Sequence, residues 1–254
     1  MKLVKILAIA MAMVLATAAS GAIAKELVVF SAGAVKSALS TLVPVWEARS
    51  GHRLLVTYAA AGDLRGKLAA GERADIVILP LENFAAVEKD GLTTTTSRRD
   101  LGAVGMGVAV KAGAKLPDLS SEDGFKRALV DAKSLTYMDP ARGTSGKHFD
   151  EVVLPKLAIR DLVRAKTVLG EGGMIAEKVG RGEVEMAIHQ MTEMLPVAGI
   201  SIAGTLPPSL QKTTVYAGAV MNATKSPVEA TEFLAFLVGK DGRAEFLAKG
   251  FSAP

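Results

Sequence analysis

Four short turns rich in glycine and other small residues are the segments of this 254-residue chain best suited to bind a ligand. Each turn follows a short apolar run and precedes a segment with helical spacing. The first N–H groups of a helix have no partners within the helix, and the helix dipole adds partial positive charge there. Such turns bind anions, and small residues let a ligand approach the backbone closely. The four turns are Ser31-Ala32-Gly33, Ala60-Ala61-Gly62-Asp63, Arg142-Gly143-Thr144-Ser145-Gly146 and Glu171-Gly172-Gly173.

One turn of this kind is ordinary in any protein of alternating strands and helices, but two in each half of the chain predict an anion site. The apolar runs predict strands over residues 27–30, 54–58, 76–79, 104–110, 135–138, 165–169 and 186–189. Helical spacing covers residues 35–49, 64–70, 147–157, 174–180 and 227–248. This alternation predicts an α/β fold with mainly parallel strands, in which ligands bind at the carboxyl ends of the strands. Residues 102–107 and 213–216 are expected to cross between two halves.

The N-terminal segment is typical of an export signal. Lys2 and Lys5 precede an apolar run over 6–19, and Ala22-Ile23-Ala24 matches the small-x-small pattern at which signal peptides are cleaved. We therefore expect a mature protein that begins at Lys25, lies in the periplasm and is not embedded in a membrane.

Composition argues against several classes of function. The net charge is only +4, and two of the basic residues lie in the export signal, so the sequence does not predict a nucleic-acid partner. The chain has no cysteine, and its three histidines are dispersed, so neither disulfides nor a protein-bound metal ion are expected. No motif predicts an organic cofactor.

Several motifs together resemble the periplasmic molybdate-binding protein family. They are Val28–Val35, Gly71–Ile78, Asp139–Gly146 and the final helix, in the family's order. The resemblance implies a type II periplasmic binding fold, with a small anion held between two lobes and delivered to an ABC transporter permease. It divides the chain into a signal peptide (1–24), a discontinuous first lobe (25–105 plus 215–254) and a second lobe (106–214).

The resemblance also implies which residues bind the ligand. Ser31, with the Ala32 amide, matches the family's first serine ligand, and the Thr144-Ser145 and Gly172-Gly173 amides match second-lobe contacts. The family's second serine falls at Ala60-Ala61, which has no hydroxyl, and its tyrosine falls at Gln190. Because these side chains differ, the ligand is either an oxyanion of the molybdate type or a small organic carboxylate, and the planar fork of Arg142 suits a carboxylate.

His189 and Gln190 end a predicted strand, where they would face the ligand. His189 could donate a hydrogen bond, transfer a proton or only order Gln190. Some secreted proteins similar to this family are aconitate isomerases, which shift a double bond by proton transfer. Two hypotheses therefore stay open at the level of sequence. The chain is a solute-binding protein without catalytic residues, or an isomerase that uses His189 with Glu171 or Asp63.

Overall fold

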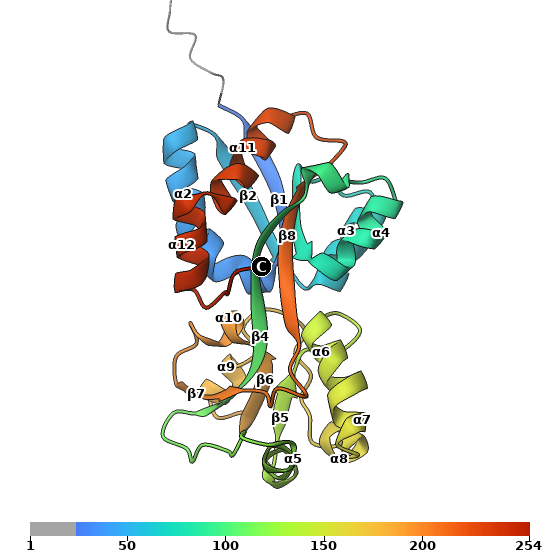
Figure 1. Ribbon diagram of the computed structural model, residues 1–254, viewed down its shortest axis with the longest axis vertical. Helices are drawn as coiled ribbons and strands as arrows, with labels where there is room; N and C mark the ends of the chain where they lie inside the picture. Colours follow the sequence, from blue (N-terminus) through green and yellow to red (C-terminus); the bar gives the residue numbers. More distant parts are fainter. Residues whose placement is uncertain (1–23) are drawn as a thin grey trace, which may run out of the picture.

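The computed structural model describes residues 24–254 and shows two α/β lobes, one above the other in Figure 1. Two long strands, β4 (Arg99–Lys111) and β8 (Thr213–Val220), run between the lobes. Most of the predicted export signal, residues 1–23, lies outside the described residues. Within residues 24–254, no helix has the length and apolar character needed to cross a membrane.

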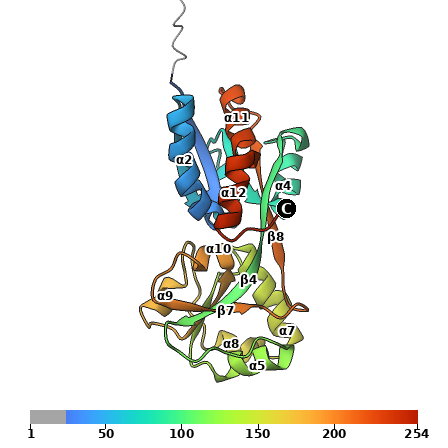
Figure 2. The same cartoon turned by 60° about the vertical axis from the view of Figure 1, so that its left-hand side comes forward.

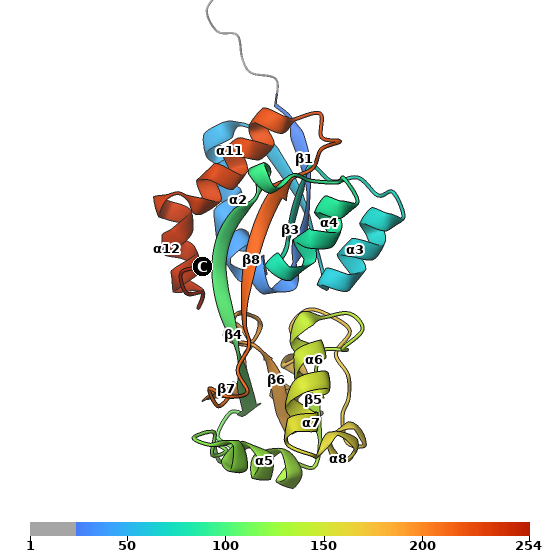
Figure 3. The same cartoon turned by 45° about the vertical axis from the view of Figure 1, so that its right-hand side comes forward.

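The first lobe is built around β1 (Glu26–Ala32), which pairs in parallel with β2 (Arg53–Ala59) and β3 (Ile76–Pro80). Strand β8 runs antiparallel to β3. Leu39, Trp46 and Phe233 belong to the core that packs helices against the sheet, and Leu64 and Phe84 belong to a second core. The helices of this lobe are α2 (Lys36–Ser50), α3 (Ala61–Ala69), α4 (Phe84–Lys89), α11 (Pro227–Val238) and α12 (Lys240–Ala248), with 3₁₀ turns η1 (Gly33–Val35), η2 (Leu81–Asn83) and η3 (Thr95–Ser97). As Figure 3 shows, α3 and α4 lie on the opposite side of the sheet from α2 and α12.

The second lobe has β6 (Met186–Gln190) between β4, which is antiparallel, and β5 (Leu135–Tyr137), which is parallel. Strand β7 (Ile200–Thr205) pairs with β4. Phe125 and Phe149 lie in one core of this lobe, and Val179 and Met194 lie in another. Its helices, seen below the first lobe in Figure 2, are α5 (Glu122–Asp131), α6 (Thr144–His148), the π-helical η4 (Phe149–Val153), α7 (Leu154–Lys156), α8 (Arg160–Arg164), α9 (Glu177–Gly180) and α10 (Met191–Met194).

An ion cluster around Asp150 connects β5 to the helices of the second lobe. The Asp150 side chain is fully buried and accepts hydrogen bonds from Tyr137 (3.0 Å), Arg160 (2.6 Å) and Arg164 (2.6 Å). Burial alone would raise the pKa of the Asp150 carboxyl, but these hydrogen bonds outweigh it and lower the pKa to about 2. The Asp150 carboxyl is therefore ionised at neutral pH.

The sequence predicted the two-lobed α/β architecture but not all of its elements. The sheet is mixed rather than mainly parallel, because β4 and β8 run antiparallel to their neighbours. Residues 165–169 were predicted to be a strand but form none. Thr167 makes an isolated bridge to Leu135, and Gly170, just after the predicted strand, makes another to Met138. Residues 102–107 and 213–216, predicted to cross between the halves, lie in β4 and β8, and the two strands pair there, which was not predicted. The lobe boundaries at residues 105 and 215 stay a prediction.

Candidate functional site

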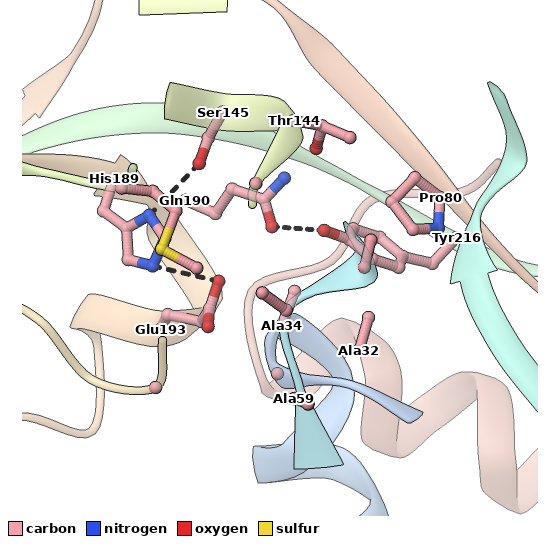
Figure 4. Close-up of a pocket in the computed structure, with 16 residues that line it drawn as sticks. Ala32, Ala34, Ala59, Pro80, Thr144, Ser145, His189, Gln190, Glu193 and Tyr216 are labelled. Atoms are coloured by element: carbon pink, nitrogen blue, oxygen red, sulfur yellow. Dashed lines mark hydrogen bonds and ion pairs between the residues drawn. The ribbon is translucent and has the colours of Figure 1, made fainter. Parts of the chain in front are cut away.

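A small cavity of about 30 Å³ lies between the two lobes. We call it the inter-lobe pocket. Figure 4 shows that residues from both lobes surround it, with Ala32, Ala34 and Ala59 on one side and Thr144, Ser145 and His189 on the other. Its full lining is Ala32, Gly33, Ala34, Ala59, Ala60, Ala61, Pro80, Met138, Gly143, Thr144, Ser145, Gly173, His189, Gln190, Glu193 and Tyr216.

Three helical segments begin at this pocket. The 3₁₀ turn η1 follows β1 and continues into α2, α3 follows β2, and α6 follows β5. The residues before their first turns, Ala32, Ala60 and Gly143, are extended or nearly so and cap no helical N–H group with a side chain. Apart from Gly62, whose N–H donates to the Arg142 carbonyl, the N–H groups of these first turns can therefore bind an anion from both lobes at once.

The fourth predicted turn is not a helix start, which corrects the sequence prediction. Gly172 has a φ angle of 148° and Gly173 one of 69°, so the chain stays in a loop there. Helix α9 begins only at Glu177. Gly173 lines the inter-lobe pocket, whereas Gly172 does not.

Gln190 and Tyr216 form a fixed polar wall of the pocket. Burial raises the pKa of the Tyr216 hydroxyl, and the charge of Glu193 adds to the effect, so Tyr216 stays neutral. Its hydroxyl donates to Gln190 Oε1 at 2.6 Å, as drawn in Figure 4. This bond occupies the amide oxygen and leaves the Gln190 NH₂ group free to donate to a ligand.

His189 and Glu193 lie side by side in the pocket. His189 Nε2 lies 3.1 Å from Glu193 Oε2, and the two side chains are only 2% and 11% exposed. The geometry does not make a hydrogen bond between them, and the contact becomes an ion pair when His189 is protonated. On the other ring nitrogen, Nδ1 lies 3.3 Å from Ser145 Oγ. Two titratable groups therefore meet in a nearly dry site, where they can exchange a proton with each other or with a ligand.

Most of the predicted ligand-binding residues lie in the pocket lining. They are Ala32, Gly33, Ala60, Ala61, Thr144, Ser145, Gly173, His189 and Gln190. The others are placed elsewhere. Ser31 is fully buried, and its hydroxyl donates to the carbonyl of Ala32 at 3.3 Å. Gly62 touches the second lobe instead of the pocket, because its N–H donates to the Arg142 carbonyl at 3.0 Å.

Arg142 and the acidic residues predicted near it form a contact between the lobes. The Arg142 guanidinium binds both oxygens of Asp63, with the shortest distance at 2.7 Å. Glu171 lies 3.8 Å from the same guanidinium, is 87% exposed and does not line the pocket. Arg142 thus binds Asp63 and is not free to bind a carboxylate ligand. Glu171 and Asp63 do not line the pocket and are not placed to act as bases there.

Glu193 and Tyr216, the most distinctive side chains of the site, were not predicted from the sequence to line it. Tyr216 comes from β8, and no local pattern connects it to the four turns. Glu193 lies four residues after His189, but His189 belongs to strand β6 and Glu193 to helix α10, so helical spacing does not predict their contact. Within residues 24–254, no three histidine or acidic side chains come together in a way that could hold a metal ion.

Comparison with known proteins identifies the family. The family model described as bacterial extracellular solute-binding protein matches residues 27–252. The chain belongs to this family. The family's description is of solute binding, and the inter-lobe pocket is a cavity in which this chain could bind a solute.

Individual relatives agree with this assignment. The aconitate isomerase of a Pseudomonas species is 31% identical over 220 residues, which cover 85% of this chain and 83% of that protein. The periplasmic molybdate-binding protein of Azotobacter vinelandii superposes with a TM-score of 0.75 at 18% identity, covering 90% of this chain and 99% of that one. The sulfate-binding protein of Mycobacterium tuberculosis gives a TM-score of 0.73 at 16% identity, covering 89% and 86%. These two structures confirm the two-lobed periplasmic binding protein fold.

Proposed function

We propose that this protein captures a small organic carboxylate in the inter-lobe pocket. The observation that supports this is the convergence of three helix starts, from both lobes, on one cavity that also holds the Gln190 amide. Hydrogen bonds to an ionised ligand contribute about 1.5–3 kcal/mol each, so a few of them give micromolar affinity after the cost of association. A ligand that contacts both lobes favours the closed arrangement, because only that arrangement offers all the contacts.

Glu193 favours an organic acid over a molybdate-type oxyanion. The Glu193 carboxylate repels any anion in the pocket, and a molybdate-type oxyanion presents its charge on every side. Among the described residues, the lining of the pocket holds no lysine or arginine that would offset Glu193. An organic acid can turn a carbon or a hydroxyl group toward the His189–Glu193 pair and keep its carboxylate on the helix starts.

The setting we propose is the periplasm. The predicted signal peptide over residues 1–24 would export the chain, and membership of the solute-binding family supports delivery of the ligand to an ABC transporter permease. The small anion and the permease are thus its proposed partners.

Thermal shift and calorimetry with the full chain, expressed with its own N-terminal segment, test the proposal. The panel contains molybdate, sulfate, propionate, succinate and trans-aconitate. We expect carboxylates to stabilise the protein by about 2.7 kcal/mol at a hundred times the dissociation constant. Ser145→Ala should weaken binding, whereas Ser120→Ala, at an exposed position, should not. Binding of molybdate alone would contradict the proposal, as would the absence of binding by every anion.

The His189–Glu193 pair favours a second candidate function, isomerisation of an unsaturated tricarboxylate. The likeness to the Pseudomonas aconitate isomerase along most of both chains supports it. In this reaction a base removes a proton from the methylene carbon, the double bond moves by one position, and a proton returns to the former vinyl carbon. The pair supplies one group to accept the proton and one to return it, and no oxidant or cofactor is consumed.

NMR of trans-aconitate incubated with a catalytic amount of protein tests this second candidate. Accumulation of the cis isomer with wild type, and its loss with His189→Gln, would support isomerisation. An unchanged spectrum at saturating ligand would leave capture alone as the function.

A further inference from the structure

A second cavity of about 120 Å³ opens beside the inter-lobe pocket. We call it the side chamber. Gly33, Ala59, Gly173 and Glu193 line both cavities, so the two are adjacent. The lining unique to the side chamber is Lys36, Ser37, Tyr58, Met174 and Thr192.

The two cavities differ in what they can hold. A water needs about 10–15 Å³ of such volume, so the inter-lobe pocket has room for little more than one carboxylate group. The side chamber is four times larger on the same scale. A ligand with more than one acid group would therefore extend from the pocket into the side chamber.

Buried hydroxyls without partners show that the side chamber is polar and unsatisfied. Thr192 is only 2% exposed, and its Oγ1 is buried without a hydrogen-bond partner among the described residues. Ser37 Oγ is buried and equally without a partner in that part of the chain. Because an unpaired buried hydroxyl costs stability, two of them lining one cavity indicate that a bound group satisfies them.

Lys36 lines the side chamber and supplies a positive charge, whereas no lysine or arginine of residues 24–254 lines the inter-lobe pocket. Its Nζ lies 5.7 Å from the centre of the Tyr58 ring, and the ion-pair partner of nearby Glu193 is His189 and not Lys36. Burial raises the pKa of the Tyr58 hydroxyl, so that group is a neutral donor or acceptor. The chamber thus combines a cation and neutral hydroxyls with the carboxylate of Glu193, which lies 3.1 Å from His189. The cation and the hydroxyls are the groups that can bind a further carboxylate.

We propose that the side chamber is a second anion subsite, in which Lys36, Ser37 and Thr192 bind a further carboxylate of the ligand. The ligand is then an aliphatic di- or tricarboxylate, with its first carboxylate in the inter-lobe pocket. This inference rests on the proposed capture of a carboxylate and names the class of ligand.

Calorimetry with the full chain tests the inference, with propionate, succinate and trans-aconitate as probes. Lys36→Met should weaken trans-aconitate binding by about 10- to 100-fold, since a charge-assisted contact is lost, and should change propionate binding by less than about twofold. Lys89→Met, an exposed lysine at the end of α4, is the matched control and should change neither.

Thr192→Val gives an independent readout that does not depend on charge. It should raise the melting temperature of the ligand-free protein, because a buried unpaired hydroxyl is removed, and yet weaken trans-aconitate binding. If Lys36→Met and Thr192→Val leave the preference for trans-aconitate over propionate unchanged, the side chamber is not a subsite, although carboxylate capture stands. If wild type binds none of the three probes, both proposals fail.

Discussion

Replacing Glu193 by glutamine should tighten ligand binding and slow any isomerisation. The carboxylate repels an anionic ligand, and in an isomerisation it would take part in proton transfer. The side chain is 11% exposed and lies 3.1 Å from His189, so little solvent screens its charge. A ligand carboxylate about 5 Å away would meet a repulsion of about 3 kcal/mol at an effective dielectric constant near 20. The partner His189 offsets part of this when protonated, which leaves about 1–2 kcal/mol.

Glu193→Gln should therefore bind carboxylates about 5- to 30-fold more tightly than wild type. If the protein also isomerises its ligand, turnover should fall by about 10²- to 10⁴-fold, the usual contribution of a proton-transfer group. Calorimetry gives the affinity and NMR gives the turnover. Glu171→Gln, at a side chain that is 87% exposed and outside the pocket, is the control and should alter neither. Weaker binding by Glu193→Gln would refute the reasoning, because the carboxylate would then contribute to ligand binding instead of opposing it.

Three further predictions concern the residues that shape the site and the lobes. A Cβ atom on Gly33 would lie 2.6 Å from Glu193 Oε1 and would narrow the inter-lobe pocket that Gly33 lines, so Gly33→Ala should weaken ligand binding, as calorimetry can measure. Arg142→Gln removes a solvent-screened contact with Asp63 between the lobes and should weaken ligand binding by about two- to fivefold, and unchanged binding would be the contrary result. The pKa of Asp150 is lowered to about 2, so its stabilisation is complete above about pH 5 and is lost as pH falls toward 2. Because solvent screens Arg160 and Arg164, the free energy of unfolding should fall by only about 1–2 kcal/mol. Urea unfolding at each pH should show this fall in wild type but not in Asp150→Asn.

Local patterns were enough to predict the backbone of the site. Strands β1, β2 and β5 each lead into a helical segment whose start reaches the pocket, and the small residues at those turns are visible in the sequence. Strand β6 likewise ends at Gln190, as its apolar run indicated.

Side-chain partners across the lobes could not be predicted in the same way. The bond of Tyr216 to Gln190 joins β8 to β6, and the pairing of Arg142 with Asp63 joins the turn before α6 to α3, so both depend on how the lobes meet. The Glu171-Gly172-Gly173 turn resembles a helix start in sequence. Its positive φ angles nevertheless keep it a loop, and φ is not readable from glycine alone.

The most direct test of carboxylate capture is to identify the molecule that the protein carries. The full chain would be expressed with its own N-terminal segment, purified without ligand, incubated with a periplasmic extract and repurified. Mass spectrometry of the released ligand, with elemental analysis for molybdenum and tungsten, then gives its identity and stoichiometry. We predict one organic acid with two or more carboxyl groups per protein. Stoichiometric molybdenum or tungsten, with no organic acid, would contradict the account.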